Sequence, residues 1–143
     1  MSNIHKFTEH VKITYGKAST ALGGETDDLI TSAAFVDMEN YDLAVAVAHI
    51  TNVASGKIIT LRLWEATAAA GTGSQSLAIT DTFTAEATSD TDVLVAQVRA
   101  AALTSGYQYV GFKLSTDDSG DGTEIGGGVI LQLRSRYPQS SLP

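Results

Sequence analysis

The fold is decided by one stretch of the sequence, Tyr41-Asp42-Leu43-Ala44-Val45-Ala46-Val47-Ala48-His49-Ile50. Successive side chains of a β-strand point to opposite faces of the sheet, so the leucine and valines at positions 43, 45 and 47 share one face and the alanines at 44, 46 and 48 share the other. Both faces are therefore apolar. A strand without a polar face is typical of the middle of a sheet, and we predict that residues 41–50 form a central strand.

Shorter runs with the same alternation recur along the chain, separated by Gly, Asn, Asp and Ser. About seven or eight runs can be marked, at residues 10–15, 31–36, 41–50, 57–66, 77–85, 93–103, 106–116 and 126–137. Residues 93–103 are ambiguous, because their alanines allow a short helix while Val93 and Val95 favour a strand, which we prefer. No segment offers the helices that parallel strands need as crossovers. We predict an all-β antiparallel sandwich, jelly-roll-like, with a barrel as the alternative closure.

The alternation also predicts which side chains face the core. In the first run, it places Val11, Ile13 and Tyr15 on the buried face. The last run is expected to bury its large apolar residues and to expose its polar ones, with Val129, Leu131 and Leu133 inside and Gln132, Arg134 and Arg136 outside.

A chain of 143 residues is long enough for one domain with one core. We expect a sandwich domain over residues 10–137, an N-terminal arm over residues 1–9 and a C-terminal tail over residues 138–143. The arm carries Ile4 and Phe7, which offer apolar side chains to a neighbouring subunit. Only 17% of the residues are charged, below the roughly 25% of an ordinary soluble domain. Such a surface suits a protein that other subunits cover.

Charge and composition exclude several classes of function. A net charge of −7 disfavours nucleic-acid binding, which depends on Lys and Arg neutralising phosphates. The absence of cysteine excludes disulfides, thiolate metal sites and cysteine nucleophiles. The N-terminus has no apolar signal region, and no stretch approaches the roughly 18 apolar residues of a membrane span. We therefore expect a protein made in the cytosol, with neither nucleic acid nor membrane as a partner.

Motifs for catalysis or metal binding are also missing. The chain has no Gly-x-Ser-x-Gly motif, no carboxylate pair at a spacing typical of acid–base catalysis, and three histidines that lack the spacing of zinc ligands. The run from Asp117 to Asp121 resembles the start of a calcium loop, but Gly128 stands at the twelfth position, where such a loop needs a bidentate Glu. We prefer a hairpin loop there. The expectation is a protein without enzymatic activity, metal or cofactor.

Four stretches occur in a characteristic order: Val36-Asp37-Met38-Glu39-Asn40-Tyr41-Asp42, Leu63-Trp64-Glu65, Tyr107-Gln108-Tyr109-Val110-Gly111-Phe112-Lys113 and Arg134-Ser135-Arg136-Tyr137-Pro138. Their order resembles that of small virion proteins of tailed bacteriophages, which decorate heads or sit in the head–tail structure. The resemblance implies a β-sandwich that cements capsomers, as a trimer at local symmetry axes. It supplies no catalytic residues.

The expected function is that of a capsid decoration, or cement, protein on the virion surface, which binds the assembled lattice and stabilises it. Its expected partners are the major capsid protein or other virion subunits, and further copies of this chain, with a trimer favoured. The alternatives are a structural protein of the tail or head–tail connector, and a carbohydrate-binding or adhesive module. The candidate interface residues are Ile4, Phe7, Trp64, Tyr107, Tyr109, Arg134, Arg136 and Tyr137.

Overall fold

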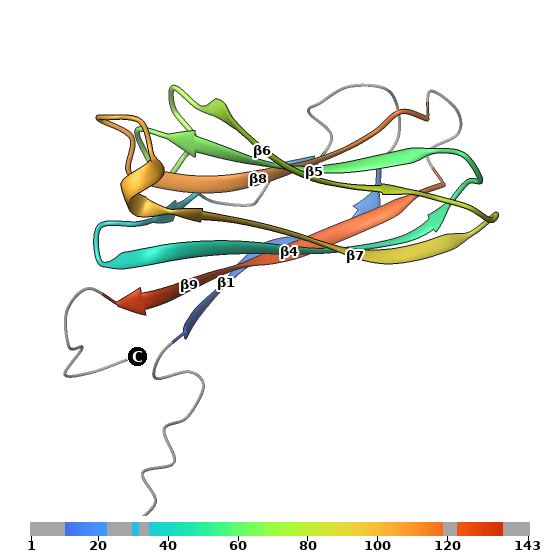
Figure 1. The fold of residues 1–143 in the computed structure, drawn as a ribbon, viewed down its shortest axis with the longest axis horizontal. Helices are drawn as coiled ribbons and strands as arrows, with labels where there is room; N and C mark the ends of the chain where they lie inside the picture. The colour runs from blue at the N-terminus through green and yellow to red at the C-terminus, as the bar shows by residue number, and fades with distance from the viewer. Residues whose placement is uncertain (1–10, 23–29, 32–34, 119–122, 136–143) are drawn as a thin grey trace, which may run out of the picture.

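The computed structural model describes residues 11–22, 30–31, 35–118 and 123–135. The expected arm at residues 1–9 and the tail at residues 138–143 lie outside this part of the chain. Within it, nine strands form two antiparallel sheets stacked as a sandwich, which confirms the predicted fold class (Figure 1). The sheets appear as two layers, one holding β5, β6 and β8 and the other β1, β4, β7 and β9.

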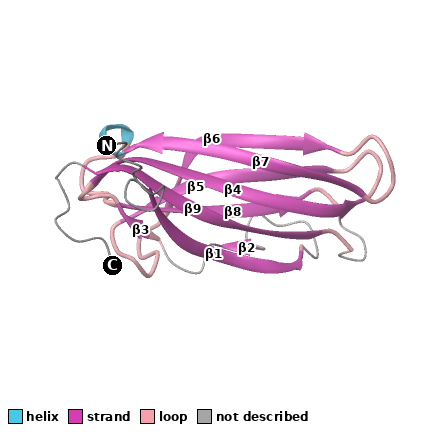
Figure 2. Cartoon of the chain, turned by 90° about the horizontal axis from the view of Figure 1, so that it is seen from below, coloured by secondary structure: helices cyan, strands magenta, loops and turns pink. Residues whose placement is uncertain are grey.

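The four-stranded layer is called sheet A here. Its strand order is β1 (Val11–Ala21), β9 (Ile125–Ser135), β4 (Tyr41–Val53) and β7 (Asp90–Arg99). Sheet B has the order β2 (Ile30–Thr31), β8 (Tyr109–Thr116), β5 (Ile58–Ala66) and β6 (Gln75–Thr84), with β3 (Val36–Asp37) also paired to β8. A 3-10 turn, η2 (Ala100–Ala102), follows β7. Viewed from below, β6 and β7 run along one long side of the sandwich (Figure 2).

The central position predicted for residues 41–50 is confirmed, because β4 is hydrogen-bonded to β9 on one side and to β7 on the other. The strand continues to Val53, three residues beyond the prediction. The ambiguous stretch is a strand up to Arg99, and its alanines form η2. β7 begins at Asp90, three residues before the predicted run 93–103.

Around the middle of β4, the core is built from small side chains on sheet A and large ones on sheet B. Ala44, Ala46 and Ala48 of β4 are fully buried or nearly so. Sheet B fills the space above them with Ile59, Leu61, Leu63, Phe112 and Leu114, all fully buried. Facing layers interdigitate when large side chains of one lie over small side chains of the other. Alanines on the inner face of sheet A therefore leave room for the large side chains of sheet B.

Two glycines extend this pattern around the Phe112 ring. A Cβ atom at Gly16 would lie 2.6 Å from Cε1 of Phe112, and one at Gly128 would lie 3.2 Å from its Cζ. Such distances are shorter than normal van der Waals contact. Gly16 and Gly128 thus leave on sheet A the recess that the Phe112 ring occupies.

The prediction of which β9 side chains point into the core is wrong. Gln132 pairs with Ala44 and Ile130 pairs with Ala46, so both lie on the inner face, where Gln132 is 1% exposed. Leu131 and Leu133 lie on the outer face and are only half-buried. Gln132 is accommodated inside because its Nε2 donates a 2.6 Å hydrogen bond to the backbone carbonyl of Asp37. The prediction failed because β9 carries apolar residues on both faces, and the face with Val129, Leu131 and Leu133 was chosen over the face with Ile130.

The facing of β1 needs the same correction. Val11 is buried as expected, but Ile13 is 53% exposed. Ile13 pairs with Leu131 and Val11 with Leu133, which places both on the outer face of sheet A.

None of the helices in the described part of the chain is long and apolar enough to cross a bilayer.

Candidate functional site

The outer side of sheet A is apolar across all four of its strands. We define the outer apolar face by its described apolar side chains that are exposed or half-buried: Ile13, Leu43, Val45, Val47, Val93, Val95, Val129, Leu131 and Leu133.

The strand register arranges these side chains in rows across the sheet. Val47 lies between Val95 and Val129, and the next row places Val45 between Gln97 and Leu131. Cross-strand pairs on one face have Cβ atoms about 5 Å apart, so each row is a continuous strip. Val95 remains 48% exposed, Val93 50% and Ile13 53%. Contiguous apolar surface of this kind on a soluble chain marks an interaction site.

Arginine and histidine side chains lie at the ends of this face, and no charged side chain lies in its middle among the described residues. Arg99 pairs with Leu43 at one end, and His49 pairs with Val93 at the other. Arg134, at the end of β9, lies 3.9 Å from the carboxylate of Asp42, and both side chains are substantially exposed. An exposed ion pair of this kind contributes at most about 1 kcal/mol to stability. The middle of the face therefore has no charge that a partner would need to neutralise.

Of the candidate interface residues, Ile4, Phe7, Arg136 and Tyr137 lie outside the described residues. The structure places the other four on three separate surfaces. Trp64 pairs with Gly111, two residues from Tyr109, so Trp64 and Tyr109 share the outer face of sheet B. Tyr107 lines a pocket, and Arg134 lies one residue before the end of β9 of sheet A. Their role as an interface stays a prediction.

The indole ring of Trp64 is already in contact with a cation. The Nζ atom of Lys113 lies 3.7 Å from the ring centroid, within the range of a cation–π interaction. The indole Nε1 is buried and has no hydrogen-bond partner. A stacking platform for a sugar ring needs an open aromatic face, whereas Lys113 covers one face of Trp64.

The described residues of the four stretches that carry the phage resemblance come together at one end of the sandwich. Gln108 Nε2 donates a 2.8 Å hydrogen bond to Oδ1 of Asp37, and the backbone N–H of Gln108 donates a 3.2 Å hydrogen bond to the carbonyl of Ala66. Arg134 lies beside Asp42. The sequence order of these stretches therefore corresponds to one connected region, in which Asp37 joins β3, β8 and β9.

A buried carboxylate fixes the turn beside this region. Glu65 is 1% exposed, and it accepts hydrogen bonds from Gln75 Nε2 at 2.6 Å and from the backbone N–H of Thr104 at 2.8 Å. Burial raises the pKa of the Glu65 carboxyl, but the hydrogen bonds from the side chains of Thr104 and Gln75 and from the Thr104 backbone lower it more, so the pKa lies below its usual value. Glu65 is thus an ionised anchor for the Thr104 turn.

An open pocket of about 340 Å³ adjoins η2. Its lining residues come from the β3–β4 connection and from the segment between β7 and β8, and they are Met38, Glu39, Ala100, Leu103, Gly106, Tyr107 and Gln108. The pocket holds one carboxylate, that of Glu39, and no histidine. It offers neither a nucleophile–base pair nor a group of metal ligands.

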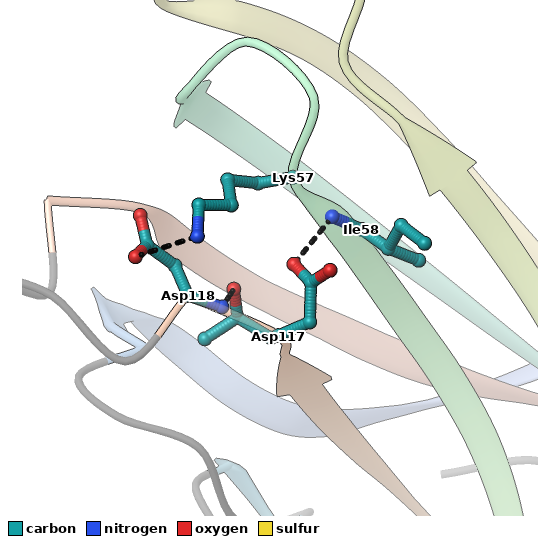
Figure 3. A network of polar contacts seen from close by, with 5 residues as sticks. Lys57, Ile58, Asp117 and Asp118 are labelled. Carbon is teal, nitrogen blue, oxygen red and sulfur yellow. Dashed lines mark hydrogen bonds and ion pairs between the residues drawn. The ribbon is translucent and has the colours of Figure 1, made fainter.

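At the opposite end of the chain's long strands, Asp117 and Asp118 fasten β8 to the start of β5 (Figure 3). The backbone N–H of Ile58 donates a 2.7 Å hydrogen bond to Oδ1 of Asp117, and Lys57 Nζ lies 3.2 Å from Oδ1 of Asp118. Both carboxylates therefore contact the first residue of β5 or the residue before it. Residues 119–122 of the candidate calcium loop lie outside the described residues. Over the part of the chain that is described, no three His, Asp or Glu side chains cluster as metal ligands would.

No protein-family model and no curated protein matches the chain. Its fold is similar to that of a chain in the structure of infectious bursal disease virus, Gx strain, with 15% identity, a TM-score of 0.50, and coverage of 90% of this chain and 34% of that one. It also matches Clostridium thermocellum xylanase 10B, comprising CBM22-1 and GH10 modules complexed with xylohexaose, at 10% identity, a TM-score of 0.46, and coverage of 90% and 27%. The chain spans about a third of the viral chain it matches. At these identities the likeness is one of fold alone.

Sequence reasoning missed the outer apolar face, although its signal was present. The stretch 41–50 is apolar on both faces, which we used only to infer a central strand. A central strand in a sandwich has one face on the core and one toward solvent. Apolar residues on both faces of such a strand therefore also predict a partner for the outer face.

Proposed function

We propose that the chain is a structural protein of a virion, and specifically a capsid decoration protein that binds the assembled lattice without catalysing a reaction. One observation carries the proposal: the outer apolar face has no charged side chain in its middle. While it is exposed to water, a face of this kind adds little to the free energy of folding. When another protein covers it, the buried apolar area contributes favourable free energy of binding. The proposal therefore assigns the protein a function in docking.

The assignment to a virion has two supports. The resemblance to small phage virion proteins rests on four stretches that the fold brings into one connected region. The sandwich is also similar in fold to a chain of a virus structure. In this role the protein binds the major capsid protein or other virion subunits on the capsid surface, and it self-associates, for which the resemblance implies three copies.

Stabilisation of a shell by such a protein follows from mass action. A ligand that binds the assembled lattice and not the free subunits shifts the equilibrium toward the assembled state. Each bound copy adds its own binding free energy, so many modest contacts over a lattice give a large effect. No active site is needed for this mechanism.

The carbohydrate-binding alternative has less support. It would use Trp64, Tyr107 or Tyr109 as a stacking platform, but Tyr107 lies apart from the other two and Lys113 covers one face of the Trp64 ring. A tail or connector protein would present the same kind of docking face, and the experiment below separates it from a decoration protein.

The test is to mix the purified full chain with bare shells and with tails of the virus that encodes it, and to image the particles by electron cryo-microscopy. Shells and tails without added protein are the control. We expect added density at regular positions of the shell lattice, and shells that resist heating better than the control. Density on tails alone would replace decoration by a tail function. No density on either particle at saturating protein, with a hit in a parallel glycan screen, would overturn the proposal.

A further inference from the structure

We infer that the pocket beside η2 binds one arginine side chain of a partner protein, whose guanidinium group pairs with the carboxylate of Glu39 and packs against the ring of Tyr107. This cavity is called the η2 pocket. Its lining residues are Met38, Glu39, Ala100, Leu103, Gly106, Tyr107 and Gln108. The inference concerns the free chain, and it does not depend on the virion function proposed above.

Backbone hydrogen bonds hold the walls of the η2 pocket in place. The N–H of Met38 donates a 2.9 Å hydrogen bond to the carbonyl of Gln108, which ties the β3–β4 connection to the segment before β8. The N–H of Tyr107 donates to the carbonyl of Thr104 at 2.9 Å, closing a turn in which Gly106 has a φ of 91°. Glycine adopts such an angle without the strain that other residues meet. The pocket is therefore formed by the fold before a ligand arrives.

The lining combines apolar side chains with one aromatic ring. Met38 is 2% exposed, and Ala100 and Leu103 are half-buried and packed against the core. Tyr107 is half-buried as well. An arginine side chain has a methylene stem that packs on apolar groups and a planar head that stacks on aromatic rings. Both parts of an arginine side chain thus have a matching group in this pocket.

Three carboxylates lie in or beside the η2 pocket. Glu39 lines it and is exposed. Asp37 accepts a 2.8 Å hydrogen bond from the side chain of Gln108, another lining residue. Glu65 accepts a 2.8 Å hydrogen bond from the backbone N–H of Thr104, in the turn that carries the pocket wall. A carboxylate can accept two parallel hydrogen bonds from a guanidinium group, and Glu39 is placed to do so.

Positive charge around the pocket is scarce. Residues 100–108 contain no charged side chain, and Arg99 before them lies on the outer apolar face of sheet A. Arg134, at the same end of the sandwich, is paired with Asp42. In the described part of the chain, no Lys, Arg or His side chain forms an ion pair with Glu39. Because a recess with low-dielectric walls concentrates the field of nearby charges, the pocket attracts a cation.

The size of the η2 pocket selects one side chain of a protein over a larger ligand. A volume of about 340 Å³ is at the lower end of the range for ligand pockets, and this pocket is open to solvent. It therefore covers the end of one side chain and leaves the rest of the ligand outside. A single ion pair at an exposed position is weak, with a dissociation constant on the order of millimolar. Such a contact acts as one part of a larger contact between two proteins.

The test is a titration of the isotope-labelled full chain, followed by NMR of its backbone amides. The probe is a tripeptide with blocked ends and arginine between two glycines. The control probe carries citrulline in place of arginine, which keeps the shape and removes the charge. We expect the signals of Glu39 and of residues 100–108 to shift with the arginine peptide, with a dissociation constant of about 1–10 mM. The citrulline peptide should bind at least about threefold more weakly.

Three results of this titration would overturn the inference. The first is equal binding of the arginine and citrulline peptides, because the pocket would then not recognise charge. The second is a set of shifts spread over the acidic surface of the chain instead of around the η2 pocket. The third is the absence of any shift at about 20 mM arginine peptide, a concentration above the expected dissociation constant.

Substitutions then assign the two contacts. Glu39→Gln keeps the size of an exposed side chain and removes its charge, so it should weaken binding of the arginine peptide about two- to fivefold. Tyr107→Leu keeps an apolar side chain and removes the ring, with an expected loss of about two- to fivefold. Glu86→Gln, exposed in the β6–β7 connection, changes the net charge equally and should bind like the wild type.

An equal loss in Glu39→Gln and Glu86→Gln would show that the overall charge of the chain attracts the peptide, and would overturn the inference. Wild-type binding in Glu39→Gln would do the same. Circular dichroism checks that each variant folds. If Tyr107→Leu does not fold, Glu39→Gln and the citrulline peptide decide, since both leave the fold of the pocket intact.

Discussion

The carboxylate of Asp81, on edge strand β6 of sheet B, accepts a 2.9 Å hydrogen bond from the backbone N–H of Val95, on edge strand β7 of sheet A. Asp81 pairs with Leu61, so its side chain points inward between the sheets. Unpaired N–H groups of edge strands are templates for unwanted pairing, and an inward-pointing charge is one way to protect them. The backbone of the β6–β7 side of the sandwich is thus protected from pairing with another strand. The adjoining outer apolar face has no such protection.

Asp81→Ala should expose the Val95 N–H to solvent. We expect amide hydrogen exchange at Val95 to accelerate by at least about tenfold, with a loss of roughly 1.5–3 kcal/mol in the free energy of unfolding, because a hydrogen bond to a charged acceptor is removed. Asp81→Asn keeps an acceptor and is the control. Equal exchange rates at Val95 in the wild type and Asp81→Ala would mean that this hydrogen bond does not protect the edge.

Glu65→Gln should destabilise the fold at neutral pH by roughly 1–3 kcal/mol, because the Thr104 N–H and Gln75 then face a neutral amide. The pKa of Glu65 in the folded protein lies below the ordinary value of 4.5. Its ionisation therefore contributes stability that is fully present above about pH 4.5 and is lost as the pH falls through the lower, folded-state pKa. The difference between wild type and Glu65→Gln in urea unfolding should shrink with falling pH over that window. A difference that does not change with pH would contradict this.

Gly128→Ala should destabilise the sandwich, because the added Cβ would lie 2.5 Å from the carbonyl oxygen of Val47 and 3.0 Å from the Cα of Ala48. Both atoms belong to the backbone of β4 and cannot turn away. We expect a loss of roughly 1–3 kcal/mol in the free energy of unfolding. Thr82→Ala, at an exposed position of β6, should change it by less than about 0.5 kcal/mol. Wild-type stability in Gly128→Ala would show that β9 and β4 are less tightly packed than described.

Trp64 is the chain's one tryptophan, so its fluorescence reports on the outer face of sheet B. Because Lys113 lies over the ring at 3.7 Å, adding soluble oligosaccharides should leave the emission maximum unchanged. Lys113→Gln removes the cation and should shift the emission by itself, which shows that the probe responds. A saturable shift of the wild type with any sugar would favour the carbohydrate-binding alternative.

Alternation in the sequence was sufficient to predict the sandwich and the central place of β4. In β8, for example, Val110, Phe112 and Leu114 alternate with polar or small residues, so the periodicity and the size of the side chains agree. In β9 they disagree. Val129, Leu131 and Leu133 alternate with Ile130 and Gln132, so the strand has large side chains on both faces, and periodicity alone does not say which face is inside.

The polar contacts were beyond sequence reasoning because their partners are far apart in the chain. Gln132 is separated from Asp37 by 95 positions, and its burial follows from that one carbonyl. Asp81 and Glu65 likewise acquire their roles from Val95 and Thr104, on another strand or turn. The outer apolar face was predictable in principle, since β4 is apolar on both sides. It was missed because one apolar side of β4 was assigned to the core, and the other was taken only as a sign that the strand lies in the middle of its sheet.

The most direct test of the account is a reconstruction of the protein on the shell of its virus, at a resolution that separates strands. The account predicts density on the outside of the lattice, with the outer apolar face of sheet A buried against another protein subunit. Shells that carry no added density, or bound copies whose outer apolar face is open to solvent, would contradict it.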